Sequence, residues 1–481
     1  MTAQGKPEPL LIGGVATPGR GPVLEAINPA DGRVTGRYTT ATLDDVADAV
    51  RAANAAASAP DWHDLLPHLR ARILHAIAAQ IDDNREMLAT LQMRQNGKTI
   101  SECRGQAAAC AAIFRYYAAV CETQETDVTT PRGPYLSLTV QEPYGTVGLI
   151  TPWNSPLTMD AQKLAPAIAA GNAVLLKPSE ITPGIGLALG QICQEAGIPP
   201  GIVNVLSGSG HIVGNAIVRH PNVRMVSFTG GSQTGRAIAA AAAEKLMPVA
   251  LELGGKSPHI VFADADVEAA AQAVAGGIFG SMGQSCVAGA RLFVERRIYG
   301  MFVEQVVARA NAYRIGAPEN EMSELGPLAS FAHRDRVETL VQSARDDGGR
   351  ILCGGERPVG FSEGAYYRPT VIDGLGNQAH ICQEEVFGPV LMVLPFSDED
   401  DLIAQANDTA YGLACGIWSA DFKRSWRVAR RIECGTVWIN SYKSLSVATP
   451  FGGVKESGIG REKGREGLRL YQQLKSIYTA L

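Results

Sequence analysis

The sequence predicts an α/β protein whose core is a buried parallel sheet. Five short apolar segments rich in β-branched residues follow one another along the chain: GTVGLI, NAVLLK, IVNVL, VRMVSF and PVALEL. Helical stretches such as GIGLALGQICQEAG and QTGRAIAAAAAEK lie between them. Strands that are buried on both faces form continuous apolar runs, and helical crossovers make such strands parallel. This alternation is typical of nucleotide-binding proteins.

The length and composition allow this architecture. The chain has 481 residues, of which 46% are hydrophobic and 19% are charged. At about 150 residues per domain, this length is enough for roughly three domains. The 52 glycines exceed the ordinary share of about 7%, yet they form no collagen-like period and no Gly/Ser linker. We therefore expect them at single positions where the backbone needs them.

The segment before the parallel region predicts a hairpin-like start and then helices. Residues 1–40 carry short apolar runs broken by Pro and Gly, a pattern that favours irregular or hairpin structure. Thr42 can cap a helix whose apolar residues recur at helical spacing. A second helix is predicted from near Pro67 to a stop near Asn96. The alternating segment YLSLTVQEP predicts an exposed antiparallel strand.

A second α/β pattern begins after Gly254 and Gly255, which we interpret as a hinge between two lobes. This part includes a helix-forming segment, SFAHRDRVETLVQSARDD, and two strand-forming segments, GIWSA and GTVWIN. Helices and strands alternate again, so the second lobe is also expected to be α/β.

Charge and cysteine usage exclude several classes of protein. The formal net charge is −5, and no dense basic cluster offsets it, which argues against nucleic acid or an anionic membrane as the main partner. The nine cysteines are scattered without zinc-binding spacing, so no metal site is expected. No stretch reaches the length of a membrane span, and the first residues lack a signal-peptide pattern. From these features we expect the protein to reside in a reducing, cytoplasmic compartment.

Two glycine patterns could hold a dinucleotide, because each follows a predicted strand and opens a helix. The first, Gly208–Gly214, has one residue too many for the common G-x-G-x-x-G fingerprint. The second, Gly230–Gly235, places a hydroxyl at Ser232 ahead of helix amides that can meet a pyrophosphate. Either pattern, taken alone, is also consistent with an ordinary strand-to-helix turn.

Three further positions could carry chemistry. Lys177 and Glu180 of KPSE follow an apolar strand, where such sheets bind ligands, although the pair also fits a solvated loop. Small residues flank Cys286 in FGSMGQSCVAGAR and would let a substrate approach its sulfur, but this composition alone favours an inert core thiol. Glu252, at the end of an apolar strand, must be either paired or functional, because an unpaired buried acid is costly.

The order of these motifs resolves the alternatives. TPWNSP, KPSE, FTGG-x-x-x-G, LELGGKSP, GQSCVAGAR, EEVFGPV, NDTAYGLA and PFGGVKESGIGRE occur in this order along the chain. The series resembles that of the aldehyde dehydrogenase superfamily, from about residue 20 to the C-terminus. One motif is modest evidence, but eight motifs in order are highly specific.

The resemblance implies a hydrolytic, NAD(P)-dependent oxidation of an aldehyde to a carboxylic acid. Cys286 matches the nucleophile, which forms a thiohemiacetal and then a thioester. Asn154 and the backbone N–H of Cys286 match the donors of the oxyanion hole. Glu252 matches the general base that activates water to hydrolyse the thioester.

The resemblance also implies which residues hold the cofactor. Lys177 and Glu180 match contacts to the adenosine ribose, and Glu180 favours NAD, with NADP possible as an alternative. Gly231 departs from the family pattern, in which many members have Ser, so altered phosphate contacts are expected. The full set of implied cofactor positions is Trp153, Lys177, Ser179, Glu180, Gly210, Gly230, Gly231, Ser232, Gly235, Glu385 and Phe387.

The substrate is less defined. Four residues lie near positions where oxidisers of small aldehydes in the family carry aromatic side chains: Ser155, Gln162, Gly280 and Leu445. The pocket is therefore expected to be wider and more polar, with Tyr442 and Phe451 still available to line it. The hypothesis is a medium-sized or functionalised aldehyde rather than acetaldehyde.

The family fold implies three parts. These are a Rossmann-like parallel-sheet cofactor domain (1–123 and 142–253), a second α/β catalytic domain (254–460) and a small β oligomerisation flap (124–141 and 461–481). Exposed strand edges in the flap need a cover, so a homodimer or homotetramer is expected. Two alternative functions remain: a CoA-acylating aldehyde dehydrogenase, and a non-catalytic family member with a binding or structural role.

Overall fold

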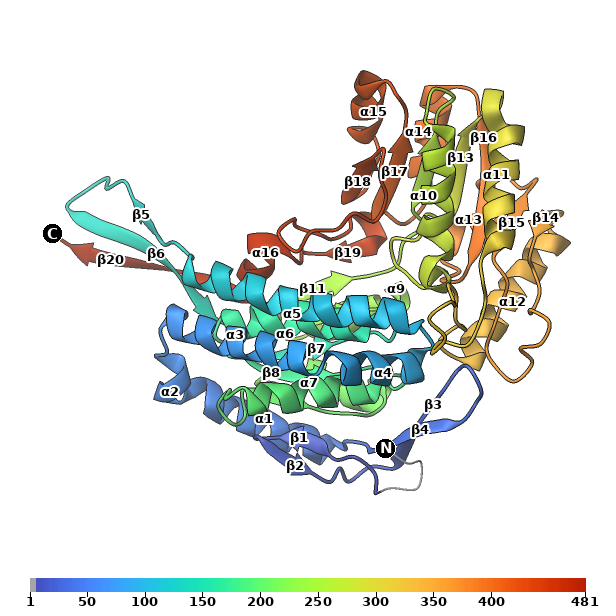
Figure 1. Ribbon diagram of the computed structural model, residues 1–481. Helices are drawn as coiled ribbons and strands as arrows, with labels where there is room; N and C mark the ends of the chain where they lie inside the picture. The colour runs from blue at the N-terminus through green and yellow to red at the C-terminus, as the bar shows by residue number, and fades with distance from the viewer. Residues whose placement is uncertain (1–5) are drawn as a thin grey trace.

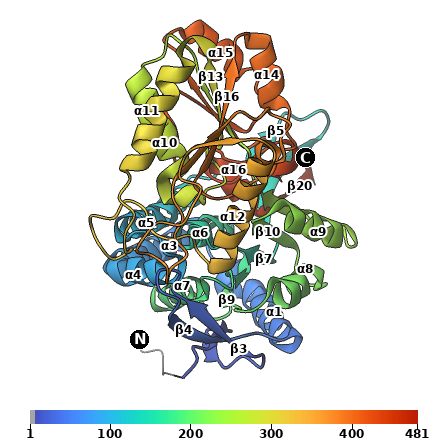
Figure 2. The ribbon, with the colours of Figure 1, turned by 90° about the vertical axis from the view of Figure 1, so that its right-hand side faces the viewer.

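The chain forms two α/β domains and a projecting three-stranded arm (Figure 1). The computed structural model describes residues 6–481, so residues 1–5 of the predicted first domain lie outside the described residues. In Figure 2 the second domain stands above the first.

The first domain is built on an eight-stranded sheet with five parallel strands at its centre. The five predicted apolar segments form these strands. Antiparallel strands flank them, with β1 paired to β9 and β19 paired to β11. In spatial order the sheet consists of β19 (Gly458–Ile459), β11 (Val249–Glu252), β10 (Met225–Thr229), β7 (Thr146–Ile150), β8 (Ala173–Lys177), β9 (Val203–Val205), β1 (Leu10–Ile12) and β2 (Val15–Thr17).

Two groups of helices cover this sheet, one on either side of β7 and β10 (Figure 2). The first group consists of α3 (Pro67–Asp83), α4 (Arg85–Asn96), α5 (Ile100–Glu122), α6 (Pro156–Ala169) and α7 (Pro183–Glu195). The second group consists of α1 (Leu43–Ser58), α8 (Asn215–Arg219) and α9 (Ser232–Ala243). The short α2 (Pro60–His63) follows α1, and the hairpin β3 (Val23–Ile27) and β4 (Val34–Thr39) precedes it.

Local chemistry explains the helix boundaries. Thr42 caps α1, and Asp45 bonds back to the Thr42 backbone, which completes a capping box. The single helix predicted between Pro67 and Asn96 is wrong, because the structure divides this segment into α3 and α4. The amide of Asn84 donates to the carbonyl of Gln80 at 2.9 Å, and such local bonds compete with helix continuation.

The second domain has its own seven-stranded sheet, which is parallel except for the edge strand β14. Its order is β14 (Arg350–Cys353), β15 (Thr370–Asp373), β16 (Val390–Phe396), β13 (Arg291–Glu295), β12 (Pro258–Val261), β17 (Ala414–Trp418) and β18 (Thr436–Ile439). Its helices are α10 (Val267–Phe279), α11 (Tyr299–Ala312), α12 (Phe331–Asp346), α13 (His380–Gln383), α14 (Glu399–Asn407) and α15 (Phe422–Ala429).

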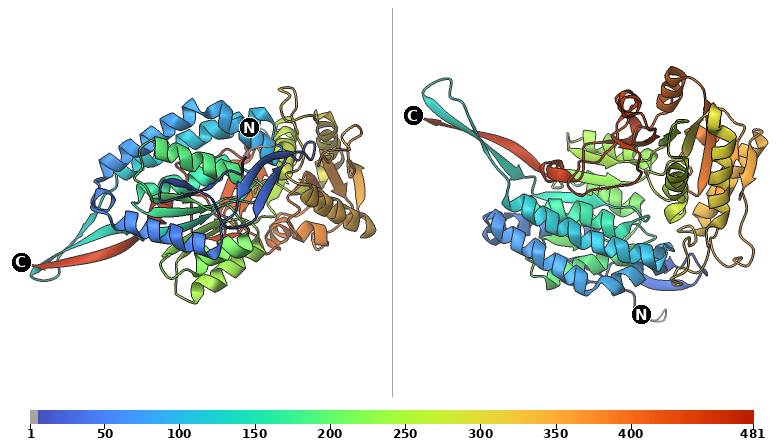
Figure 3. Two further views of the ribbon diagram at one scale, coloured as in Figure 1. Left: turned by 90° about the horizontal axis from the view of Figure 1, so that it is seen from below. Right: turned by 45° about the horizontal axis from the view of Figure 1, so that its top comes forward.

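The arm consists of β5 (Asp127–Thr129), β6 (Tyr135–Pro143) and β20 (Gln472–Ala480). Strand β20 pairs with β6 along all of its residues, and the C-terminus lies at the tip of the arm (Figure 3). The predicted division put the residues before β20 in the flap or the second domain. Instead, β19 pairs with β11, and α16 (Gly464–Arg469) packs on α5 and α6, so this segment returns to the first domain.

Candidate active site

A cavity of about 710 Å³ opens at the carboxyl ends of the central strands of the first domain. Strands β7 and β10 are neighbours although β8 and β9 lie between them in sequence, and such a reversal of strand order is where open α/β sheets bind ligands. The cavity is lined by most of the predicted cofactor residues. They are Trp153 after β7, Lys177, Ser179 and Glu180 at the end of β8, Gly210 after β9 and Gly230 after β10.

An ion pair is held at the wall of this cavity. Lys177 Nζ lies 3.0 Å from Glu180 Oε2, and the Gly210 N–H donates to Glu180 Oε1 at 2.7 Å. Burial would raise the pKa of Glu180, but the Lys177 ammonium and the Gly210 N–H together hold that pKa below its ordinary value. Glu180 is therefore an ionised, fixed acceptor, which suits a pair of ribose hydroxyls.

The N-terminus of α9 adjoins the same cavity. Gly231 precedes the helix and no side chain caps the first turn, so the first N–H groups are free to meet an anion such as a pyrophosphate. A Cβ at Gly231 would meet nothing within 4 Å, whereas a Cβ at Gly235 would lie 2.5 Å from Leu253. Ser232 does not line the cavity, because its hydroxyl donates to the Glu456 carbonyl at 3.4 Å.

Trp153 joins the cavity to the second domain. Its ring contacts Phe387 edge-on, with centroids 5.4 Å apart, and lies 5.2 Å from the ring of His333. His333 Nε2 lies 2.7 Å from the Phe387 carbonyl oxygen and donates to it. Phe387 has a left-handed backbone with φ 56°. His333 was not predicted from the sequence, and no motif there pointed to it.

Glu385 lies in the second domain, between α13 and β16, and its Oε1 accepts from the Gly255 N–H at 2.9 Å. A Cβ at Gly254 would lie only 2.4 Å from the other carboxylate oxygen, so this approach requires glycine. Burial raises the pKa of Glu385 to about 7, although the Gly255 N–H and Lys256 oppose the shift. Neither Glu385 nor Phe387 lines the 710 Å³ cavity.

Cys286 lies in the loop before β13, half-buried against Tyr442 and Phe451. Burial raises the pKa of its thiol to about 12, and the carboxyls of Glu385 and Glu252 add to the rise. The thiol is therefore protonated at neutral pH and needs a proton acceptor before it can act as a nucleophile.

Hydrogen-bond donors lie beside the thiol. Asn154 Nδ2 donates to the carbonyl of Gln284 at 3.0 Å, two residues before Cys286. Within residues 6–481, the second N–H of this amide and the backbone N–H of Cys286 have no acceptor. These two free donors are the kind of groups that an oxyanion hole needs.

Glu252 is the last residue of β11 and is 6% exposed. Its Oε2 makes no hydrogen bond within the described chain. Burial raises the pKa of Glu252 well above its ordinary value, and the nearby Glu462 carboxylate adds to the rise. A carboxylate with a raised pKa and a free oxygen is a stronger base than an exposed glutamate.

Behind Glu252 lies a buried ion pair that was not predicted from the sequence. Lys163 Nζ lies 2.5 Å from Glu462 Oε1, and the two side chains are 1% and 2% exposed. Ser227 and Gln162 also donate to Glu462. Gln162, predicted near the substrate pocket, is thus tied to this carboxylate. Glu462 lies within the motif PFGGVKESGIGRE, which was the available signal.

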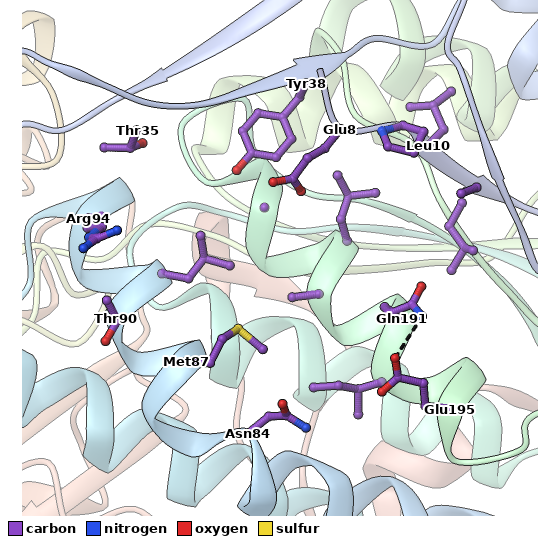
Figure 4. A pocket seen from close by; sticks show the side chains of 18 of the residues that line it. Glu8, Leu10, Thr35, Tyr38, Asn84, Met87, Thr90, Arg94, Gln191 and Glu195 are labelled. Atoms are coloured by element: carbon purple, nitrogen blue, oxygen red, sulfur yellow. Dashed lines mark hydrogen bonds between the residues drawn. The ribbon is translucent and has the colours of Figure 1, made fainter. Parts of the chain in front are cut away.

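A second cavity, of about 600 Å³, lies between β1, β4, α4 and α7 (Figure 4). Tyr38 and Glu8 lie toward one end of it, and Gln191 donates to Glu195 toward the other. None of the predicted site residues lines this cavity, so it is separate from the candidate active site. Across the described part of the chain, no helix combines the length and apolarity needed to cross a membrane.

Comparison with known proteins agrees with this geometry. The sequence profile of the aldehyde dehydrogenase family matches residues 17–477. A chloroplastic betaine aldehyde dehydrogenase of Atriplex hortensis is 41% identical over 464 residues, covering 94% of this chain and 92% of that protein. A peroxisomal aminoaldehyde dehydrogenase of Malus domestica is 40% identical over 469 residues, covering 95% and 93%.

The solved structures agree as well. The NAD⁺ complex of an aldehyde dehydrogenase from Bacillus cereus superposes with a TM-score of 0.97 at 37% identity, covering 99% of this chain and 97% of that one. The match of the sequence profile over nearly the whole chain and the similarity of the complete fold lead to the same conclusion. This chain belongs to the aldehyde dehydrogenase family.

Proposed function

We propose that this enzyme oxidises an aldehyde to a carboxylic acid by the hydrolytic route, with Cys286 as nucleophile and Glu252 as general base. The observation that carries the proposal is Glu252 itself. It is a buried carboxyl with a free oxygen and a raised pKa, close enough to Cys286 to raise the pKa of the thiol. A base of this kind is required when water, rather than CoA, takes the acyl group.

In the first step the Cys286 thiol gives its proton to the Glu252 carboxylate, which passes it to solvent, and the resulting thiolate adds to the aldehyde carbon. Asn154 and the Cys286 N–H would then donate to the oxygen on which negative charge develops. Each preorganised donor of this type contributes about 3–4 kcal/mol to stabilisation of the transition state. Their free N–H groups beside the thiol support this role.

The residues of the first cavity, together with Glu385 and Phe387 outside it, fit a dinucleotide. Lys177 and Glu180 would hold the adenosine ribose. The uncapped start of α9 would hold the pyrophosphate, and Glu385 and Phe387 would hold the nicotinamide ribose. These residues would hold NAD⁺, which would supply the hydride acceptor for the carbon attached to Cys286. The remaining proposed contacts, from Trp153, Ser179, Gly210, Gly230, Gly231, Ser232 and Gly235, surround this cavity or the start of α9.

The second half-reaction is hydrolysis of the thioester on Cys286. Glu252 takes a proton from water as the water oxygen attacks the acyl carbon, and the Cys286 sulfur leaves as thiolate. Because the pKa of Glu252 is raised, its carboxylate is a stronger base than an exposed glutamate.

We further propose that NAD is preferred over NADP. Glu180 is ionised and held in place by Lys177 and Gly210. A fixed negative charge next to the ribose would repel the 2′-phosphate of NADP. The B. cereus enzyme, solved with NAD⁺, is consistent with this choice.

We propose a homodimer or homotetramer that assembles through the arm, in the cytoplasm. Exposed apolar side chains on its strands include Val128, Leu474 and Tyr478, each about two-thirds exposed, and such a surface favours a protein partner. All nine cysteines carry free thiols, which suits a reducing compartment.

The test is a panel of aldehydes with NAD and NADP, followed by reduced-cofactor absorbance and by detection of the acid. Acid formation without CoA supports the hydrolytic route, and acyl transfer that requires CoA would replace it. An intact, NAD-binding protein with no turnover on any aldehyde would favour the non-catalytic alternative.

A further inference from the structure

Two lysines, Lys443 and Lys463, lie near Cys286 together with the carboxyls of Glu252 and Glu385. Lys443 and Lys463 make no ion pair with any residue between 6 and 481, although both lie close enough to Cys286 to lower the pKa of its thiol. Lys98 is 4% exposed, its Nζ has no hydrogen-bond partner among these residues, and it reaches Glu102 only at 3.9 Å. Lys463 has the carboxyls of Glu462 and Glu252 nearby. Within the described part of the chain, Glu102 is the one carboxylate near Lys443 and Lys98.

The backbone holds two of these lysines in unusual conformations. Lys443 has φ 56° and Lys463 has φ 60°. With its ψ of 176°, Lys463 lies in a backbone region that residues other than glycine rarely adopt. Lys443 is held near the site by its neighbour Tyr442, whose hydroxyl donates to the carbonyl of Val287, the residue after Cys286. Strain that the surrounding structure maintains is a frequent mark of a functional position.

Lys443 and Lys98 form one cluster. Ser281, in the loop that leads to Cys286, donates to Glu102, which is also the carboxylate nearest to Lys98. Burial, followed by the Lys98 ammonium, lowers the pKa of Lys443 to about 8. Lys443 is thus still largely charged at pH 7, and two ammonium groups share a single distant carboxylate. An anion placed between them would relieve this repulsion.

The same region suits a cationic substrate less well. Quaternary ammonium groups are bound by open aromatic faces, and two of the rings beside Cys286 already have a partner on one face. Lys463 Nζ lies 5.1 Å from the centroid of the Phe451 ring, and Tyr442 is stacked on His259 with centroids 4.3 Å apart. This differs from what the names of the betaine and aminoaldehyde dehydrogenases imply for those relatives.

We propose that the aldehyde substrate carries a carboxylate at the end away from its carbonyl, and that Lys443, supported by Lys98, binds this carboxylate. The proposal rests on the proposed function, because it concerns the substrate of the same site. Lys463, whose ammonium lies over Phe451, adds to the positive field around the nucleophile.

The experiment compares three aldehydes of equal chain length that differ only in their distal group. Butanal is neutral, 4-aminobutanal is cationic and 4-oxobutanoate is anionic. For the wild-type enzyme with NAD, we expect kcat/KM for 4-oxobutanoate to exceed that for butanal about 10- to 100-fold, the usual effect of a hydrogen bond to a charged group. We expect 4-aminobutanal to be the poorest substrate.

Variants then assign the preference to Lys443. In Lys443→Met, the ratio of kcat/KM for 4-oxobutanoate to that for butanal should fall at least about tenfold, mainly through KM, because the carboxylate is bound before and during reaction. Lys443→Glu should favour 4-aminobutanal over 4-oxobutanoate. Lys423→Met, which removes an exposed lysine of α15, is the matched charge control and should leave the ratio unchanged.

The outcomes separate the two proposals. If the wild type oxidises butanal but does not prefer 4-oxobutanoate, the carboxylate proposal fails and the proposed function stands. The same holds if Lys443→Met retains the wild-type ratio while its fluorescence spectrum and NAD affinity show an intact fold. If none of the three is oxidised but another aldehyde of the panel is, the carboxylate proposal fails; if no aldehyde is oxidised, the proposed function itself fails.

Discussion

The buried ion pair between Lys163 and Glu462 makes a prediction about both stability and catalysis. Glu462→Gln removes the negative charge and leaves the Lys163 ammonium buried without a carboxylate. The side chain of Lys163 is 1% exposed, so water cannot replace the lost partner. The same substitution removes one of the charges that raise the pKa of Glu252.

The magnitude follows from the geometry. At the 2.5 Å separation of the two charged atoms, Coulomb attraction is about 7 kcal/mol with an effective dielectric constant of about 20. Desolvation of both groups offsets part of this attraction. Measured losses on removing one partner of a buried pair are about 3–5 kcal/mol, which is the loss expected for Glu462→Gln. Ser227 donates to Glu462 at 3.2 Å, and this hydrogen bond would weaken when its acceptor is no longer charged.

The assay is urea unfolding followed by tryptophan fluorescence, with the double variant Lys163→Met/Glu462→Leu as control. The double variant should recover much of the loss, because it leaves no unpaired buried charge. A Glu462→Gln protein within about 1 kcal/mol of the wild type would refute this reasoning. In Glu462→Gln, the pKa of Glu252 should fall. The increase in the rate of thioester hydrolysis with pH should therefore begin at lower pH than in the wild type.

The remaining predictions concern the proposed catalytic and cofactor residues. Cys286→Ala should abolish NADH formation while NAD binding, measured by fluorescence quenching, persists; appreciable turnover would contradict its role. Glu252→Gln should give one burst of NADH and then a steady state slower by roughly 10²–10⁴-fold, and stopped-flow traces without a burst would argue against a base for hydrolysis. Glu180→Ala should raise the ratio of kcat/KM for NADP to that for NAD, and an unchanged ratio would remove the argument for NAD preference. Because burial raises the pKa of Cys286 to about 12, its alkylation by iodoacetamide in the cofactor-free enzyme should accelerate about tenfold per pH unit between about pH 7 and 9; a plateau in this range would indicate a lower pKa.

The strands of the parallel sheet could be predicted from the sequence because burial on both faces leaves a direct mark. All five apolar segments form strands, β7 to β11. Neither face of these strands meets solvent, so their sequences are apolar throughout instead of alternating with polar residues. The break at Asn84 could not be predicted in the same way. It depends on one side-chain amide bonding to the carbonyl of Gln80, and helical periodicity continues on both sides of it.

The candidate site was predictable where motifs carry it and not where it depends on distant contacts. Cys286 and Glu252 lie in motifs whose order along the chain indicates their catalytic roles. Lys163 and Glu462 are about 300 residues apart, and their pairing is decided by the return of the chain to the first domain. His333 likewise reaches Phe387 only through the packing of α12.

The pairing of β20 with β6 has a consequence for biosynthesis. A ribosome reaches Gln472 about 330 residues after Pro143, the residue with which it pairs, so β6 waits roughly 15–65 s for its partner at 5–20 residues per second. During this time the first domain also lacks Glu462, and Lys163 has no counter-ion from it. The nascent first domain is therefore incomplete until the last segment leaves the ribosome. A chain terminated before residue 458 would lack β19, α16 and β20 together, which makes it a substrate for chaperones and proteases rather than a shortened enzyme.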